Sequence, residues 1–473
     1  MPASERDLFF TSATDLAARM RKRELSPVDL MRATLERIDA VNPRLNAFVS
    51  LRPPEQLLDE AQSIADRLAH AEDVGPLAGL PLGVKDLEDT IGLPNTHGSL
   101  LFKDFRPQQD TVQVARLKRA GAIVIGKTNT PEFGYTAFTT NRVYGTTRNP
   151  WNLERTPGGS SGGSAAALAA GLVPLSTASD GGGSVRIPAS YTGLVGLKPT
   201  NGRIPWGPEE MLRASATIVS GPLTRCVRDA ALWLDVTAGA HPADPFSLPH
   251  PGYSYQETLQ RPLRRLRVAY SPTLGYARPE RQVRREVEAA LRVLERCGHH
   301  VEEVTHTIPD VVIDWVRLMA FEDLGVLTPY LRDETELDPG LLPGLDLGRQ
   351  VAAAEMGQIQ RTRMQLIRTL ERVFAGCDLL ATPTVSTVAF GAEGPLPFEV
   401  DGLPVDTPGG GIAYTYPFNF SGNPAISLRA GLNDDGLPVG LQLVAPRLRE
   451  DLLLQIAYEY EQARPWHGEW PRL

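Results

Sequence analysis

A run of glycines in the middle of the chain places one serine where a nucleophile could act. Ser184 follows Gly181, Gly182 and Gly183. Glycines let backbone N–H groups come close to a substrate oxygen, and a serine hydroxyl in that setting can attack a carbonyl carbon. The pattern therefore favours a catalytic site, with Ser184 as the natural candidate for the attacking group.

The base that would activate Ser184 is expected to be a lysine. All the histidines lie outside residues 158–190, and His97, in LPNTHGS, is expected to be a loop residue. Lysine can serve as a base if burial lowers its pKa enough to make it neutral at working pH. Lys85 ends the apolar run LPLGVKD (80–86) and meets this description. The competing interpretation is a lysine that snorkels from a strand end towards solvent.

Two other interpretations of residues 158–190 compete with a catalytic site. Segments rich in Gly and Ser are commonly flexible linkers. Here AAALAAGLV favours a helix and VPLSTAS a strand, so the order is glycine turn, helix, strand, glycine turn. A phosphate loop needs lysine where the chain has Ser164, and a dinucleotide fingerprint needs glycine where it has Arg186. Nucleotide binding is therefore unsupported.

The segments around these residues alternate between helix and strand patterns. Ser26-Pro27 marks a helix start, and apolar residues at helical spacing follow to Ile38. Further helical patterns cover 110–120, 281–296 and 349–374, and strand patterns cover 80–86, 122–127, 266–271, 379–383, 425–430 and 440–445. This alternation predicts an α/β fold with helices covering a central sheet. The Pro/Gly-rich patches 241–262 and 391–411 are expected to be surface excursions.

Composition narrows the classes of protein. The 473 residues carry a formal charge of −8, which argues against a nucleic-acid binder because such proteins concentrate Lys and Arg. The three cysteines are widely separated and suit a reducing compartment. The N-terminus lacks a signal-peptide pattern, and no run approaches the roughly 18 apolar residues of a membrane span. We expect a cytoplasmic protein with no nucleic-acid or membrane partner and no metal site.

Seven motifs, in their order along the chain, resemble the amidase signature family. They are LPLGVKD (80–86), GKTNTPEF (126–133), NPW (149–151), PGGSSGGSAAALAAG (157–171), DGGGSVRIPA (180–189), GLKPT (196–200) and PFNFSGNPAIS (417–427). The resemblance implies one amidase domain over 1–473, an α/β/α sandwich around a large mixed, twisted sheet. It also implies a signature core at about 80–205, an N-terminal helical segment at about 10–70 and a variable pocket region at about 305–420.

The resemblance implies roles for three side chains, with no cofactor. Ser184 is the acyl-forming nucleophile, Ser160 a bridging serine preceded by a cis peptide bond, and Lys85 the base. Ser160 can take the proton of Ser184 while passing its own to Lys85, and the reverse transfer protonates the departing amine. The three side chains are therefore expected to form one hydrogen-bonded chain.

The resemblance also implies an oxyanion hole at the turn, made by the backbone N–H groups of Gly181, Gly182, Gly183 and Ser184. Asp180 and Arg186 flank this turn and are expected to brace it. Ser161 is expected to satisfy nearby backbone groups rather than take part in the chemistry. Water and a small amide are then the only reactants.

The implied activity is hydrolysis of the C–N bond of carboxylic amides, in a family whose stand-alone members also cleave aryl amides, carbamates and aminohexanoate oligomers. The alternative is the glutamine-hydrolysing subunit of a tRNA-dependent amidotransferase. That subunit typically reads R-Q-P where this chain reads Arg186-Ile187-Pro188, and many family members carry Thr or Ile at the position of Gly181. Both differences disfavour the alternative. A homodimer is compatible with the resemblance.

Two regions are candidates for shaping the substrate pocket. The first surrounds Trp315 to Tyr330, and the second is the aromatic run Tyr414, Tyr416, Phe418 and Phe420. The aromatic residues could equally belong to the core, the commoner environment of such side chains. An apolar acyl or aryl substrate group is favoured over a charged one.

Overall fold

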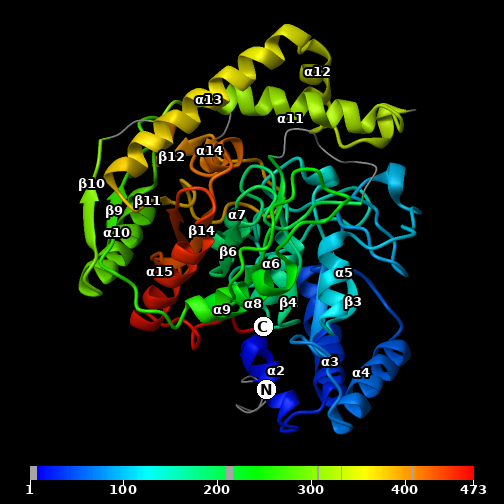
Figure 1. Ribbon diagram of the computed structural model, residues 1–473. Helices are drawn as coiled ribbons and strands as arrows, with labels where there is room; N and C mark the ends of the chain where they lie inside the picture. Colours follow the sequence, from blue (N-terminus) through cyan, green and yellow to red (C-terminus); the bar gives the residue numbers. More distant parts are fainter. Residues whose placement is uncertain (1–7, 209–216, 306–307, 332, 406–409) are drawn as a thin grey trace.

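A mixed sheet of 11 strands runs through the computed structural model, which describes residues 8–208, 217–305, 308–331, 333–405 and 410–473 (Figure 1). The strands, in spatial order, are β1 (Phe48–Leu51), β3 (Ile123–Thr128), β2 (Pro81–Lys85), β4 (Leu175–Ser176), β8 (Leu223–Thr224), β6 (Val195–Lys198), β14 (Ala425–Leu432), β15 (Pro438–Val444), β11 (Leu379–Pro383), β9 (Arg267–Tyr270) and β10 (His300–Glu303). β2 runs parallel to β3 and β4, whereas β14 is antiparallel to β6 and β15. The predicted α/β class with a large mixed sheet is confirmed.

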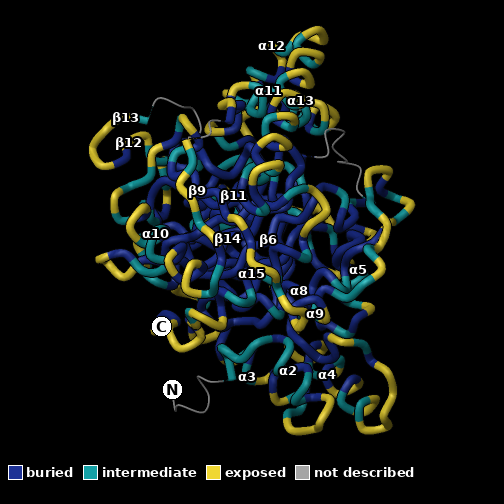
Figure 2. Tube along the Cα trace, turned by 60° about the vertical axis from the view of Figure 1, so that its left-hand side comes forward, coloured by how far each residue is buried: buried dark blue, intermediate teal, exposed yellow. Residues whose placement is uncertain are grey.

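Helices pack around this sheet. They are α2 (Ala13–Arg21), α3 (Pro27–Leu45), α4 (Pro54–Ala69), α5 (Val112–Arg119), α6 (Gly162–Ala169), α7 (Arg186–Thr192), α8 (Val227–Thr237), α9 (Tyr255–Thr258), α10 (Arg281–Arg296), α11 (Val312–Leu327), α12 (Leu342–Gln350), α13 (Ala353–Gly376), α14 (Tyr416–Ser421) and α15 (Glu450–Ala463). Figure 2 shows α11, α12 and α13 standing out from the buried interior.

The helices predicted from Ser26-Pro27 and over 110–120, 281–296 and 349–374 are all present. Ser26 Oγ caps α3 by accepting the Val28 N–H at 3.2 Å.

Four of the 11 strands were not predicted from their sequence. β1, β6, β8 and β10 are each two to four residues long, and three residues of β10 are exposed. Segments this short show too little apolar periodicity to be recognised, so only pairing with neighbouring strands defines them. The other predicted strands lie at their expected places along the chain.

Helix α6 shows that residues 158–190 are not a linker. Every residue of α6 is buried, and the helix consists mainly of alanine and glycine. Small side chains permit close approach: a Cβ added at Gly163 would lie 2.2 Å from the backbone nitrogen of Asn129. The linker interpretation is therefore wrong, because this segment packs inside the molecule.

The Pro/Gly-rich patches are surface segments, as expected. Most residues of 241–262 and of the described part of 391–411 are exposed or half-buried, and residues 406–409 lie outside the described ranges. The second patch holds the small hairpin β12 (Glu399–Val400) and β13 (Leu403–Pro404). In the described ranges, none of the helices combines the length and apolar character of a membrane span.

Candidate active site

Lys85 is the last residue of β2 and lies fully inside the molecule. Its side chain has no solvent exposure, and Nζ forms hydrogen bonds with Ser160 Oγ at 2.8 Å and Ser179 Oγ at 3.0 Å. The snorkelling interpretation is therefore wrong. Burial lowers the pKa of Lys85 to about 7, although the carboxylates of Glu88 and Asp180 act in the opposite direction. A substantial fraction of this lysine is neutral near pH 7 and can accept a proton.

Ser160 and Ser161 come directly before α6, which contacts β2. The Gly159–Ser160 peptide bond is cis, as expected from the resemblance. Ser161 Oγ donates to the carbonyl of Ser179 at 3.3 Å and accepts the Ser179 N–H at 3.4 Å. Ser161 thus satisfies backbone groups, as predicted, while its neighbour Ser160 faces Lys85.

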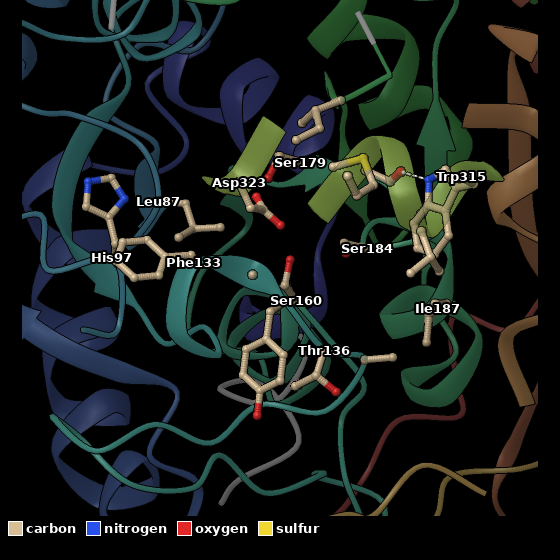
Figure 3. A pocket seen from close by; sticks show the side chains of 18 of the residues that line it. Leu87, His97, Phe133, Thr136, Ser160, Ser179, Ser184, Ile187, Trp315 and Asp323 are labelled. Carbon is tan, nitrogen blue, oxygen red and sulfur yellow. Dashed lines mark hydrogen bonds between the residues drawn. The ribbon is translucent and has the colours of Figure 1, made fainter. Parts of the chain in front are cut away.

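Ser184 lies in the glycine turn (residues 181–184), which follows β5 (Ser179–Asp180). Ser184 is half-buried and lines the same cavity as Ser160 and Ser179 (Figure 3). Within the described ranges, no hydrogen bond joins Ser160 Oγ to Ser184 Oγ. The structure therefore contains the first link of the expected chain, Lys85 to Ser160, but not the second.

Asp180 and Arg186 hold the glycine turn through a buried ion pair. Arg186 Nη2 lies 3.0 Å from Asp180 Oδ1, and neither side chain is exposed. Burial is the largest influence on the pKa of Asp180 and raises it, but the charge of Arg186 and the hydrogen bonds from Arg186 and Asn419, with the charge of Lys198, together lower the pKa to about 2, so the carboxylate stays ionised. The Gly183 N–H donates to Asp180 Oδ1 at 2.8 Å and the Val185 N–H to Oδ2 at 3.2 Å. The Gly183 N–H is therefore already used by the protein.

The cavity beside these residues has a volume of about 290 Å³. Much of its wall is apolar or aromatic: Leu87, Phe133, Trp206, Ile218, Trp315, Met319 and Leu396. Helix α11 supplies Trp315, Met319 and further lining residues up to Leu327, which confirms that the region from Trp315 onwards shapes the pocket. Among the described lining residues none is an arginine or a lysine.

Several lining residues, Ser179 and His97 among them, were not assigned to the site from the sequence. Ser179 stands one residue before the DGGGSVRIPA motif, and that adjacency was the available signal. His97 lies in a turn, as expected, and it also lines the cavity, packed against Phe102 and Phe133 with ring-centroid distances of 5.2 and 6.0 Å. Burial and the charge of Lys127 lower the pKa of His97 to about 3, so its imidazole is neutral.

The aromatic run of α14 and its preceding turn belongs to the core. Tyr414, Tyr416, Phe418 and Phe420 have no solvent exposure and none lines the cavity. Their polar atoms are satisfied internally: Tyr414 Oη donates to the carbonyl of Pro272 at 2.6 Å, and Tyr416 Oη to Asp310 Oδ1 at 2.8 Å. Of the two interpretations of this run, the core is the correct one.

The arrangement has the parts of an acyl-transfer site: a serine hydroxyl, a partly neutral lysine linked to a second serine, and a turn of backbone N–H groups. Within the described part of the chain, no group of three or more His, Cys, Asp or Glu side chains could hold a metal ion. The chemistry that these groups can perform is nucleophilic attack on a carbonyl, with proton transfer through the lysine.

Comparisons with known proteins agree with this chemistry. A family model described as Amidase matches residues 29–454. An acylamidase of Rhodococcus erythropolis is 37% identical over 99% of this chain and 98% of that protein. One subunit of the glutamyl-tRNA(Gln) amidotransferase of a Cyanothece species is 35% identical over 98% of this chain and 100% of that protein.

Solved structures give the same result. A bacterial aryl acylamidase of the amidase signature family superposes with a TM-score of 0.89 and 28% identity, covering 97% of each chain. A 6-aminohexanoate cyclic dimer hydrolase, in complex with its substrate, superposes with a TM-score of 0.88 and 32% identity, covering 98% of this chain and 99% of the other.

Proposed function

Because the chain belongs to the amidase family, and is an amide-hydrolysing enzyme, we propose that it acts through an acyl-enzyme on Ser184, with Ser160 and Lys85 as the proton relay. The observation that carries this proposal is the buried Lys85 Nζ, 2.8 Å from Ser160 Oγ, at a cavity that Ser184 also lines. A lysine with a pKa of about 7 can serve as a base without a histidine.

Acylation begins with attack of Ser184 Oγ on the amide carbonyl carbon. The Ser184 proton passes to Ser160 Oγ, and the Ser160 proton passes to neutral Lys85. When the C–N bond breaks, protonated Lys85 returns the proton through Ser160 to the departing nitrogen, which leaves as a neutral amine. Water then attacks the acyl carbon and gives one proton to the same relay. When the ester C–O bond breaks, the relay returns that proton to Ser184 Oγ, and the carboxylic acid leaves.

The negative charge on the tetrahedral oxygen needs N–H donors that are not used elsewhere. Since the Gly183 N–H donates to Asp180, we assign the oxyanion hole to the backbone N–H groups of Gly181, Gly182 and Ser184. All three residues line the cavity. Each such donor typically contributes about 3 to 4 kcal/mol to lowering the barrier.

The substrate is proposed to be an apolar acyl or aryl amide. The cavity wall is largely apolar, and burying a carboxylate without a cationic partner is costly. No Arg or Lys lines the described part of the cavity, so the free carboxylate of glutamine would find no ion-pair partner there. This favours a stand-alone amidase over a component of an amidotransferase, and acylamidase and aryl acylamidase are the names of two similar proteins.

A substrate panel assayed with the purified chain alone tests this function. We expect hydrolysis of p-nitroanilides of apolar acids, with aliphatic amides, esters and carbamates in the same series. The Ser184→Ala protein, prepared identically, measures contaminating activity. Glutamine hydrolysis that appears only after a partner protein is added would instead support the amidotransferase alternative.

The three cysteines, Cys226, Cys297 and Cys377, are free thiols. Free thiols in this number suit a reducing compartment, so we place the enzyme in the cytoplasm. The purified chain is accordingly assayed under reducing conditions.

Removing the bridging hydroxyl should disable the relay. For Ser160→Ala we expect kcat to fall by about 10² to 10⁴-fold, the range typical of a lost proton-transfer group. Ser161→Ala is the matched control, because it removes the neighbouring buried hydroxyl whose partners are backbone groups only. If Ser160→Ala kept most activity while Lys85→Ala lost nearly all, lysine would have to act on Ser184 directly.

Filling the cavity at Gly181 should change the preferred acyl size. A Cβ at Gly181 would lie 3.1 Å from Ile218 Cγ1, so a side chain there would project into the cavity wall. For Gly181→Thr we expect kcat/KM to fall by roughly 10-fold or more for anilides with bulky acyl groups and to change little for acetanilides. A fall of this size is typical when the volume of an apolar pocket changes by a methylene group or so. A uniform fall across acyl lengths would contradict this placement of the acyl group.

A further inference from the structure

Two side chains from distant segments hold the carbonyl groups of the glycine turn. The indole Nε1 of Trp315 donates to the carbonyl oxygen of Gly181 at 3.1 Å (dashed in Figure 3), and Thr415 Oγ1 donates to the carbonyl oxygen of Gly182 at 2.5 Å. Thr415 Oγ1 also lies 3.1 Å from the Ile412 carbonyl, but a hydroxyl has one proton and the Gly182 contact is the shorter.

A peptide group is planar, so holding its carbonyl oxygen also sets the direction of its N–H. The Gly181 carbonyl shares its plane with the Gly182 N–H, one of the donors assigned to the oxyanion hole. The Gly182 carbonyl shares its plane with the Gly183 N–H, which Asp180 holds from the other side at 2.8 Å. Trp315 therefore orients the Gly182 N–H. Thr415 and Asp180 together fix the Gly182–Gly183 peptide plane, which precedes Ser184.

Contacts with the glycines show how closely both side chains approach. A Cβ added at Gly182 would lie 2.3 Å from Trp315 Cζ2, and one added at Gly183 would lie 2.4 Å from Thr415 Oγ1. Gly183 also has a φ of +135°, which L side chains rarely adopt. The turn can contact Trp315 and Thr415 in this way only because it lacks side chains at these positions.

Trp315 is itself held in place while it forms part of the cavity wall. Its ring stacks on Tyr416, with centroids 5.3 Å apart and planes 19° apart, and the Tyr416 hydroxyl donates to Asp310 at 2.8 Å. We propose that Trp315 and Thr415 are positioning residues of the oxyanion hole, so that one side chain of α11 both contacts the substrate and orients the Gly182 N–H. This inference rests on the function proposed above.

Paired variants test the inference. In Thr415→Val and Trp315→Phe we expect kcat to fall roughly 10-fold with KM little changed, less than the 10²- to 10³-fold loss of an oxyanion donor itself. Thr415→Ser keeps the hydroxyl and should restore kcat. Trp466→Phe is the control for loss of an indole N–H, because Trp466 Nε1 donates to the Arg225 carbonyl at 3.1 Å away from the cavity. It should leave kcat unchanged.

The affinity for a trifluoromethyl ketone separates positioning from general structural damage. Ser184 Oγ adds to the carbonyl carbon of this inhibitor, and the oxyanion that forms mimics the transition state. Across the variants its Ki should rise by the factor by which kcat/KM falls, while Ki for the carboxylic acid product stays constant. Melting temperatures measured in parallel show whether each variant folds. If only one of Thr415→Val and Trp315→Phe folds, that variant alone is enough to compare the inhibitor Ki with kcat/KM.

Three results would overturn the inference. A raised KM at unchanged kcat in Trp315→Phe would mean that the ring only contacts substrate. A fall in kcat without loss of trifluoromethyl ketone affinity, or without rescue in Thr415→Ser, would mean that the effect does not pass through the oxyanion hole. If the proposed function itself is wrong, the unaltered protein will form no adduct between Ser184 and the trifluoromethyl ketone. That result differs from failure of the positioning inference, in which the unaltered protein still forms the adduct.

Discussion

Replacing Ser184 by alanine is expected to abolish amide hydrolysis, lowering kcat/KM by about 10⁴-fold or more, as for other nucleophilic serines that act as one unit with their base. Without Ser184 Oγ no acyl-enzyme forms, and the remaining N–H donors can only stabilise direct attack by water. The measurement is hydrolysis of a p-nitroanilide substrate under conditions in which the Ser160→Ala protein is also assayed. Full activity in Ser184→Ala would overturn the assignment.

A covalent label identifies the nucleophile independently of activity. A fluorophosphonate should modify Ser184, and peptide mass spectrometry should find the adduct there. Ser190→Ala is the matched control: Ser190 lies in the same segment, is buried, and does not line the cavity, so labelling and activity should persist. An adduct on any other serine would contradict the proposed chemistry.

Activity is expected to rise with pH along a limb centred near 7, the pKa of Lys85. Only the neutral amine can accept the proton of Ser160, so the active fraction grows as pH passes through this value. Replacing Lys85 by alanine should remove the limb and lower kcat by about 10² to 10⁴-fold. Lys85→Arg should not restore activity, because a guanidinium remains charged throughout this range.

A second buried lysine provides the control for this assignment. Burial also lowers the pKa of Lys198 to about 7, and its Nζ donates to the Pro199 carbonyl at 2.8 Å rather than to a serine. In Lys198→Met the limb near pH 7 should therefore persist. If the limb disappeared in that variant and survived in Lys85→Arg, Lys198 would be the group that controls activity.

The same pKa shift affects the stability of the fold. The pKa of Lys85 is lowered in the folded protein from 10.5 to about 7. Between these two values the unfolded chain binds a proton that the folded chain does not, so the Lys85 contribution to the free energy of unfolding rises with pH in this window. Because Lys198 has the same shift, Lys85→Met should reduce the rise in the free energy of unfolding between pH 7 and pH 9 rather than remove it, as measured by urea unfolding at the two pH values.

Much of the fold was determined by local sequence. Ser26 caps α3, and the apolar runs at 379–383 and 440–445 form β11 and β15, because capping and periodicity depend only on neighbouring residues. Motif order was enough to nominate Lys85, Ser160 and Ser184, whose roles await the variants above. The burial of Lys85 was a condition of that hypothesis, but only the packing of β2 between β3 and β4 established it.

Tertiary structure alone decided how the glycine turn is held and which of its donors are free. Trp315 and Thr415 lie 134 and 233 residues from the carbonyl groups that they hold, so no local pattern connects them to the turn. The use of the Gly183 N–H by Asp180, and the placement of Tyr414 and Phe418 in the core, likewise became known only from the packed neighbours. The physical reason is that a backbone plane or an aromatic ring takes its orientation from whatever surrounds it in space, whereas sequence periodicity records only which side of an element is apolar.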